Sequence, residues 1–173
     1  MKSFYLTDAG RVRSHNEDSV TILKNASNEY LLMVADGMGG HRAGEVASSL
    51  AVTHFGKRFS NTPSIGSKLD AVNWLNDNAS EVNNEIIEYA KKYPNAKGLG
   101  TTLVLALLTK EYLIFGNIGD STGYVLKNAS SNKSTFFSKS SCRNRPVNRR
   151  RGKIPSQKKC AYESTWSNGK SRT

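Results

Sequence analysis

The sequence predicts an α+β fold, because its strand-like and helix-like segments are grouped along the chain rather than strictly alternating. Three apolar runs come first, two amphipathic segments follow, and three more apolar runs come after them. Runs rich in β-branched and aromatic residues are typical of strands, and apolar residues three and four apart are typical of helices. Grouping of this kind favours α+β over a parallel α/β sheet. The 173 residues are enough for one domain with a hydrophobic core.

Three strands are expected near the start of the chain, at residues 2–7, 19–24 and 30–35. The third run, YLLMVA, contains no polar residue, as expected of a strand that is buried on both faces. It ends at Asp36-Gly37, a dipeptide typical of turns, and a tight loop is expected from Met38 to His41.

Two helices are expected next, from Arg42 to about Phe59 and from Leu69 to about Tyr93, where Pro94 follows. Their apolar positions are Val46, Leu50 and Phe55 in the first helix, and Leu69, Val72, Leu75, Val82, Ile86 and Tyr89 in the second. The last three strands are expected at 101–108, 112–118 and 123–127. A hairpin turn at Lys110-Glu111 would join the first two.

The formal net charge of +11 comes entirely from the last part of the chain. Residues 129–173 contain 12 Lys and Arg and one acid, Glu163, whereas residues 1–128 contain 13 basic and 13 acidic side chains. The first 128 residues therefore give no sign of a nucleic-acid-binding surface. The tail has 10 Ser among its 45 residues and no hydrophobic period, which predicts polybasic disorder. We predict a folded region at 1–128 and a disordered tail at 129–173.

The tail has a second explanation, which is a shifted reading frame. When residues 138–173 are back-translated and read one nucleotide later, codon degeneracy allows a sequence with helix formers, acid-rich turns and periodic apolar residues. Few arbitrary sequences, when read in another frame, would show the composition and apolar periodicity of a globular protein. We therefore interpret residues 129–173 as a frameshift product.

Cysteine usage and hydropathy predict a cytoplasmic protein. Both cysteines, Cys142 and Cys160, lie in the tail, so a disulfide scaffold is excluded for residues 1–128 and a reducing compartment is favoured. The N-terminus has no apolar signal-peptide core, and no run approaches the ~18 residues that a membrane span requires. We expect no association with a membrane.

Four polar clusters are candidates for chemistry: residues 13–18, 36–41, 100–102 and 116–121. Carboxylates at strand ends, beside glycines that expose backbone carbonyls, suit hard cations such as Mg²⁺ or Mn²⁺. A nearby arginine offers a planar fork for a phosphate group. Each cluster taken alone has a plainer interpretation, because Asp-Gly after a strand is usually a turn and exposed charges are usually solvated.

Other chemistries fit the motifs less well. The P-loop pattern GxxxxGK[ST] does not occur. Residues 119–123 match the GxSxG pattern of serine hydrolases, but a strand-like run follows them and no histidine lies further along the chain. A zinc site is disfavoured because the two cysteines lack C-x-x-C spacing.

The order and spacing of the clusters resemble those of the bacterial PPM-type, type 2C-like metal-dependent protein phosphatases. The quoted motifs are FYLTDAGRVRSHNEDS with its R-x-x-N-E-D, then ADGMGGH, then GTT, then GNIGDS. The resemblance covers residues 1–128. It implies a four-layer sandwich of two antiparallel sheets flanked by helices, incomplete here at the C-terminus, with a metal cluster at one end.

The resemblance implies a site for two Mn²⁺ or Mg²⁺ ions, with a third ion in bacterial members. Asp36 matches the carboxylate that bridges both metals, and Gly37 matches a ligand that acts through its backbone carbonyl. Asp18 matches the acid that binds the other metal directly or through water, with Glu17 as its water-mediated neighbour. Asp120 matches the acid that binds the third metal.

Arg13 matches the arginine that holds the substrate phosphate. Eukaryotic members place a general-acid histidine directly after the Asp-Gly pair, where this chain has Met38; the nearby His41 is the candidate for that role. The implied activity is hydrolysis of phosphoserine and phosphothreonine in proteins. The implied partners are phosphorylated proteins and a cognate serine/threonine kinase, and the protein is expected to be a monomer.

Two departures from the family pattern affect the expected activity. Thr122 stands where the family usually has arginine in G-D-S-R, and neither of the family's later motifs, S-D-G and D-N, follows Asp120. We therefore expect this chain to be an inactive, truncated enzyme. Two alternatives remain open: a non-catalytic pseudophosphatase or binding protein with a basic tail, and a chain without stable function because its sheet edge is open.

Overall fold

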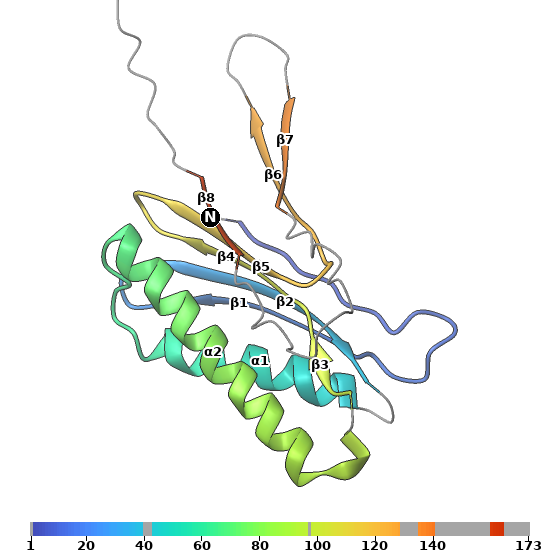
Figure 1. Cartoon of the computed structure of the whole chain (residues 1–173). Helices are drawn as coiled ribbons and strands as arrows, with labels where there is room; N and C mark the ends of the chain where they lie inside the picture. Colours follow the sequence, from blue (N-terminus) through green and yellow to red (C-terminus); the bar gives the residue numbers. More distant parts are fainter. Residues whose placement is uncertain (1, 40–42, 97, 129–134, 141–159, 165–173) are drawn as a thin grey trace, which may run out of the picture.

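The computed structural model of the protein describes residues 2–39, 43–96, 98–128, 135–140 and 160–164. Within these residues a layer of helices packs against one antiparallel sheet, and a small second sheet lies on the opposite side (Figure 1). The predicted α+β class is confirmed. No helix in the described part of the chain is long and apolar enough to cross a membrane.

The larger sheet has six strands, and its main path runs β1-β2-β4-β5-β8 with every neighbouring pair antiparallel. The short strand β3 pairs with the end of β2, and β6 and β7 form the second sheet. The strands are β1 (Asp18–Lys24), β2 (Tyr30–Met38), β3 (Gly100–Thr101), β4 (Leu103–Leu108), β5 (Leu113–Ile118), β6 (Gly123–Asn128), β7 (Thr135–Ser140) and β8 (Cys160–Ser164).

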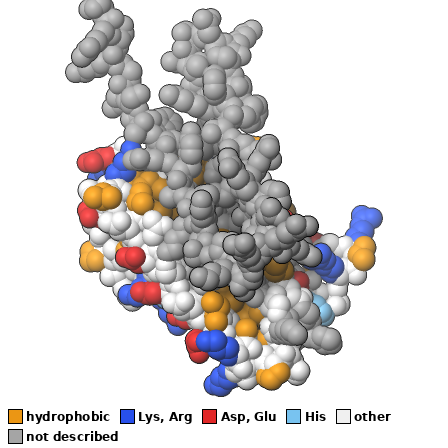
Figure 2. Space-filling model, viewed as in Figure 1, with side chains coloured by type: hydrophobic (Ala, Val, Ile, Leu, Met, Phe, Trp, Pro, Cys, Tyr) orange, Lys and Arg blue, Asp and Glu red, His pale blue; other side chains and the backbone are white. Residues whose placement is uncertain are grey.

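The helices α1 (Ala43–Ser60) and α2 (Lys68–Lys92) lie on the same face of the larger sheet, and a 3₁₀ turn, η1 (Pro94–Ala96), follows them (Figure 1). Four residues of α1 spaced four apart are buried against the sheet: Ala47, Ala51, Phe55 and Phe59. Acidic and basic side chains are interspersed on the surface over the helices (Figure 2). This mixture agrees with the balanced charge of residues 1–128.

The two faces of the larger sheet follow from the alternation of side chains along each strand. Leu31, Met33, Leu105, Leu107 and Ile114 are at most 4% exposed and form the core with the helices. The opposite face, which we call the outer face, is formed by Val20, Ile22, Leu32, Val34, Val104, Ala106 and Phe115, which are paired across β1, β2, β4 and β5. All seven are half-buried or exposed.

Most of the predicted elements are present, with two corrections. Residues 2–7 form no strand: they have no strand partner among the described residues, and Phe4 and Leu6 are 85% and 79% exposed. Leu69 was expected on the buried side of α2 but is 69% exposed. It lies in the first helical turn, whose direction is set by a capping box between Ser67 and Asp70.

The predicted tail lies largely outside the described residues. Two short strands within it are described, β7 and β8. Residues 129–134, 141–159 and 165–173 fall outside the described part of the chain. The division of the chain at residue 128 stays a prediction.

We expect Phe55→Ala to lower the free energy of unfolding by about 3–5 kcal/mol, because it removes a buried aromatic ring and leaves a cavity. The Phe55 ring is fully buried and packs edge-to-face on Trp74 with centroids 5.8 Å apart. Leu69→Ala is the control, with an expected change within ~0.5 kcal/mol because the side chain is exposed. Urea unfolding followed by tryptophan fluorescence measures both; equal effects would contradict this assignment of the core.

Candidate metal and phosphate site

Asp18 and Asp36 lie opposite each other at the same end of the sheet. Asp18 begins β1, Asp36 lies near the end of β2, and the two residues are direct partners in the antiparallel register. The alternation that places Val20 and Val34 on the outer face also places both aspartates on it. The register therefore brings together two carboxylates that are eighteen residues apart in the sequence.

The pKa of the Asp36 carboxyl is raised above its ordinary value of 3.8. Partial burial is the largest cause, followed by the negative charge of Asp18 and a hydrogen bond with it, and then by the charge of Asp120. The positive charge of Arg13 acts in the opposite direction. Asp18, Asp120 and Arg13 are thus all near enough to Asp36 to act on its charge, and the aspartates repel one another.

The backbone of Gly37 lies directly against the start of α1. The Gly37 amide donates a hydrogen bond to the Glu17 carbonyl over 3.1 Å. A Cβ atom on Gly37 would lie 2.1 Å from the Gly44 carbonyl oxygen, and one on Gly44 would lie 2.9 Å from the carboxyl carbon of Glu17. Only glycine at both positions permits this approach, which holds Glu17 and Gly37 next to the paired aspartates.

Thr102 connects Asp36 to the loop that carries Asp120. Its hydroxyl accepts a hydrogen bond from the Asp36 amide over 3.1 Å and lies 2.8 Å from the Ser121 hydroxyl. The Thr102 amide donates to the Asp36 carbonyl over 2.9 Å. The buried Asn117 holds the same loop, because its side-chain amide donates to the Ser121 carbonyl over 2.7 Å.

The loop itself depends on Gly119, which has a φ of 106°. Residues that carry a side chain rarely adopt this backbone conformation. A Cβ atom at this position would also lie 2.8 Å from the Cγ2 atom of Thr102. Gly119 therefore allows the chain to leave β5 sharply and to pass close to Thr102. Asp120 follows directly and is exposed at the surface.

Arg13 lies in the segment between the N-terminus and β1, and its side chain is exposed. Two hydrogen bonds order the end of this segment. Asn16 donates to the Thr7 hydroxyl over 2.7 Å, and the Asp18 amide donates to the Asn16 side-chain oxygen over 3.0 Å. His41, the candidate general acid, lies outside the described residues.

The donor atoms suit a divalent cation in type, since paired carboxylates and nearby backbone carbonyls are hard oxygen ligands. They form part of a cage only: no group of three or more His, Cys, Asp or Glu side chains in the described part of the chain is placed to hold a metal ion. The structure thus brings Asp18 and Asp36 together, with Asp120, Glu17 and Gly37 nearby.

Sequence reasoning missed the groups that hold these residues in place. The cluster at 100–102 stood out, but no role was given to Thr102. Asn117 lies in the cluster at 116–121, but no role was given to it either. Nothing in the sequence marked Gly44, since its importance comes from contacts between separate segments.

Paired carboxylates at the end of a sheet, within reach of the charge of an arginine, suit a divalent cation and a phosphate group in type. Comparisons with known proteins identify the family. The family model described as protein phosphatase 2C matches residues 8–141. The serine/threonine phosphatase stp of Listeria monocytogenes is 41% identical over 128 residues, which are 74% of this chain and 51% of that protein. This chain belongs to the protein phosphatase 2C family.

Solved structures show the same relationship. Serine/threonine phosphatase Stp1 from Staphylococcus aureus has a TM-score of 0.66 and 39% identity, over 70% of this chain and 48% of that one. The catalytic domain of the phosphatase PstP in complex with two manganese ions has a TM-score of 0.59 and 37% identity, over 70% and 49%. The chain spans about half the length of the relatives it matches.

We expect Asp36→Asn to stabilise the metal-free chain at pH 7 by roughly 0.2–1 kcal/mol, because it removes one of two like charges that lie directly opposite each other. The pKa of Asp36 is raised in the folded state, so its ionised form opposes folding above the ordinary value of 3.8. The gain should therefore shrink as the pH falls toward 3.8. Thermal unfolding in EDTA across this pH range measures it; a constant difference would contradict the electrostatic explanation.

We expect Thr102→Val to cost about 1–3 kcal/mol, because it leaves the Asp36 amide without its hydroxyl acceptor and removes the contact to Ser121. Thr102→Ser keeps the hydroxyl and loses one methyl group, so it should cost less, about 0.8 kcal/mol. Chemical denaturation compares the two variants. If serine costs as much as valine, packing rather than the hydroxyl joins the two segments.

Proposed function

We propose that the described part of the chain carries metal-binding and phosphate-binding residues of a phosphatase that acts on phosphoserine and phosphothreonine in proteins. The observation that carries the proposal is the cross-strand pairing of Asp18 with Asp36, within reach of the charges of Asp120 and Arg13. Membership of the protein phosphatase 2C family supports it. The names of the relatives, serine/threonine phosphatases, supply the substrate class.

Each residue would have a distinct task. Asp36 and Asp18 would bind the cations, with the Gly37 carbonyl and Glu17 beside them and Asp120 as a further ligand. Divalent cations bound there would act as Lewis acids and supply an activated water. Arg13 would bind two phosphate oxygens with its planar guanidinium and offset the negative charge that grows during transfer.

Metal binding at these carboxylates would depend on pH. Partial burial, followed by the negative charges of Asp18 and Asp120, raises the pKa of Asp36. A bound cation would favour the ionised form of the carboxyl group, so metal binding would compete with protonation at acidic pH. The motifs offer no side-chain nucleophile with a base beside it, which favours direct attack by water over a phosphoenzyme.

The wider setting is proposed on the same basis. The substrates would be phosphorylated proteins, a serine/threonine kinase would be the opposing enzyme, and the phosphatase would act as a cytoplasmic monomer. The relatives support the first point by name. The family also supports Mn²⁺ or Mg²⁺ as the cofactor, because one related structure holds two manganese ions.

We further propose that this exact chain is inactive and that residues 129–173 are read in a shifted frame. Among these 173 residues no acid other than Glu163 follows Asp120, so the carboxylates of the S-D-G and D-N motifs have no counterpart in them. The coding DNA tests the frame directly. An open reading frame one nucleotide later that encodes S-D-G and D-N would support the proposal, and its absence would refute it.

We expect the purified 173-residue chain to show no Mn²⁺-dependent hydrolysis of p-nitrophenyl phosphate above background, and a version read in the next frame after codon 128 to be active. Asp36→Asn in that version should reduce the rate to below about a tenth, because a carboxylate that would hold the cations is lost. A variant with more activity than this would contradict the role of Asp36. Turnover by the original chain would contradict its inactivity.

We expect Arg13→Ala in the active version to raise KM for the phosphate ester more than it lowers kcat, because the arginine binds the phosphate in the ground state as well. The Mn²⁺ concentration that gives half-maximal rate should stay unchanged. Steady-state kinetics at varied substrate and Mn²⁺ concentrations separate the two effects. Loss of Mn²⁺ affinity would show that Arg13 instead supports the metal ligands.

A further inference from the structure

Ser48 is a polar residue on the buried side of α1. Its side chain is 0% exposed, and helical spacing places it on the same side as Ala51 and Phe55, which pack against the sheet. Burying a hydroxyl group costs free energy unless the group is hydrogen-bonded, whereas alanine at this position would not carry that cost. The hydrogen-bond partners of Ser48 therefore indicate what the hydroxyl does.

The Ser48 hydroxyl connects α1 to the start of β1. It donates a hydrogen bond to the Glu17 carbonyl over 2.7 Å and lies 2.9 Å from the Ser19 hydroxyl. A longer contact of 3.2 Å reaches the Glu45 carbonyl in the preceding turn of α1, as is common for serine within a helix. Because a hydroxyl has one proton, the bond to Glu17 leaves the Ser48 oxygen to accept the proton of Ser19.

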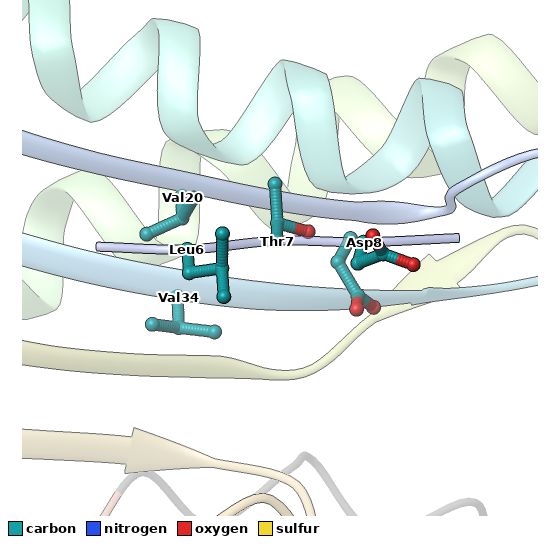
Figure 3. A pocket seen from close by; sticks show the side chains of 6 residues that line it. Leu6, Thr7, Asp8, Val20 and Val34 are labelled. Carbon is teal, nitrogen blue, oxygen red and sulfur yellow. The ribbon is translucent and has the colours of Figure 1, made fainter. Parts of the chain in front are cut away.

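The two partners of Ser48 in β1 and just before it are the residues on either side of Asp18 in the chain. Side chains alternate along a strand, so Ser19 points toward α1 while Asp18 and Val20 point to the outer face. On that face they border an open pocket of about 330 Å³ (Figure 3). The pocket is lined by Leu6, Thr7, Asp8, Asp18, Val20 and Val34. Ser48 thus supports Asp18 from the helix side of the sheet.

The Glu17 carbonyl oxygen accepts a second hydrogen bond, from the Gly37 amide over 3.1 Å. The segments that carry Ser48, Asp18 and Asp36 therefore meet at one oxygen atom. The fit is close, since a Cβ atom on Gly37 would lie 2.5 Å from the same oxygen. Without the Ser48 hydroxyl, this oxygen would keep only one of these two donors.

The end of the β1–β2 ladder has a particular need for such support. Asp18 is the first residue of β1, and its pairing with Asp36 is the last at this end of the two strands. Terminal pairs open more readily than central ones, and here two like charges face each other. We propose that Ser48 is a positioning residue, whose hydroxyl holds Asp18 opposite Asp36 through the two neighbours of Asp18. The consequence for cation binding rests on the proposed function, whereas the position of the pair does not.

Amide hydrogen exchange of the metal-free 173-residue chain tests the position of the pair. The Gly37 amide donates to the Glu17 carbonyl and the Thr102 amide to the Asp36 carbonyl, but only the first acceptor is shared with Ser48. Ser48→Ala should speed exchange at Gly37 at least about tenfold relative to Thr102, because the Glu17 carbonyl is then held less firmly. An equal change at both amides would show a role in overall stability alone and would overturn the proposal.

Two further variants make this test decisive. Ser49→Ala removes the same hydroxyl group from the next residue of α1, which is exposed, and should leave both exchange rates unchanged. Ser19→Ala should raise the ratio of exchange at Gly37 to exchange at Thr102 roughly threefold or more. Its effect should not add to that of Ser48→Ala, because the two hydroxyls act in one hydrogen-bonded chain. Additive effects would overturn the proposal, and so would an unchanged ratio in Ser19→Ala if Ser48→Ala does not fold.

Mn²⁺ alone, titrated into the same chain, tests the consequence for the cation. Bound Mn²⁺ broadens the NMR signals of nearby amides, so the amides of Asp18 and Asp36 report its binding. Ser48→Ala should raise the Mn²⁺ concentration for half-maximal broadening about tenfold, and Ser49→Ala should not change it. Unchanged Mn²⁺ binding by Ser48→Ala would overturn the link between Ser48 and the cation. Absence of broadening in the unaltered chain would contradict the proposed function, and hydrogen exchange would still decide whether Ser48 positions Asp18.

Discussion

The arrangement of the site depends on how the end of β2 is held. The Gly37 amide donates a hydrogen bond to the Glu17 carbonyl. The Asp36 amide donates to the Thr102 hydroxyl, and the Asp36 carbonyl accepts from the Thr102 amide. The start of α1 lies directly against Gly37. These contacts come from three segments that are far apart in the sequence. They fix the backbone at Asp36 and Gly37, so Asp36 stays opposite Asp18 in the strand register. The rest of the site is arranged around this one fixed position.

Holding the Asp36 carboxylate opposite that of Asp18 costs free energy when no cation is bound. Asp18 and Asp36 face each other across the strands, and the pKa of Asp36 rises because of burial and the negative charges nearby. The buried hydrophobic core, with Phe55 and Phe59 fully enclosed, stabilises the sheet enough to hold the two like charges together. Repulsion between fixed groups is a common feature of binding sites, because a ligand of opposite charge then gains more on binding.

Sequence periodicity predicted the elements well and their contacts poorly. The apolar run at 30–35 and the helical spacing of Val46, Leu50 and Phe55 reflect local structure, and both elements are where the pattern placed them. The strand was expected to be buried on both faces, but only one face is buried, and Val34 on the other face is 47% exposed. Residues 2–7 have strand-like composition, yet strand formation needs a partner, and none is found among the described residues. Thr102 owes its role to contacts with Asp36 and Ser121, which no local pattern reveals. The aspartates were candidates because they follow or precede predicted strands, and the resemblance to a family then gave each of them a role.

One alternation links folding and chemistry in this chain. Side chains of β1 and β2 that point away from the helices are first Ile22 and Leu32, then Val20 and Val34, and finally Asp18 and Asp36. A shift of one residue in either strand would move that strand's three side chains to the other face, so the apolar part of the outer face and its acidic end are specified together. The distance along the strands between the apolar side chains and the carboxylates is therefore fixed. The apolar outer face and the position of the acidic pair are in this way consequences of the same pairing.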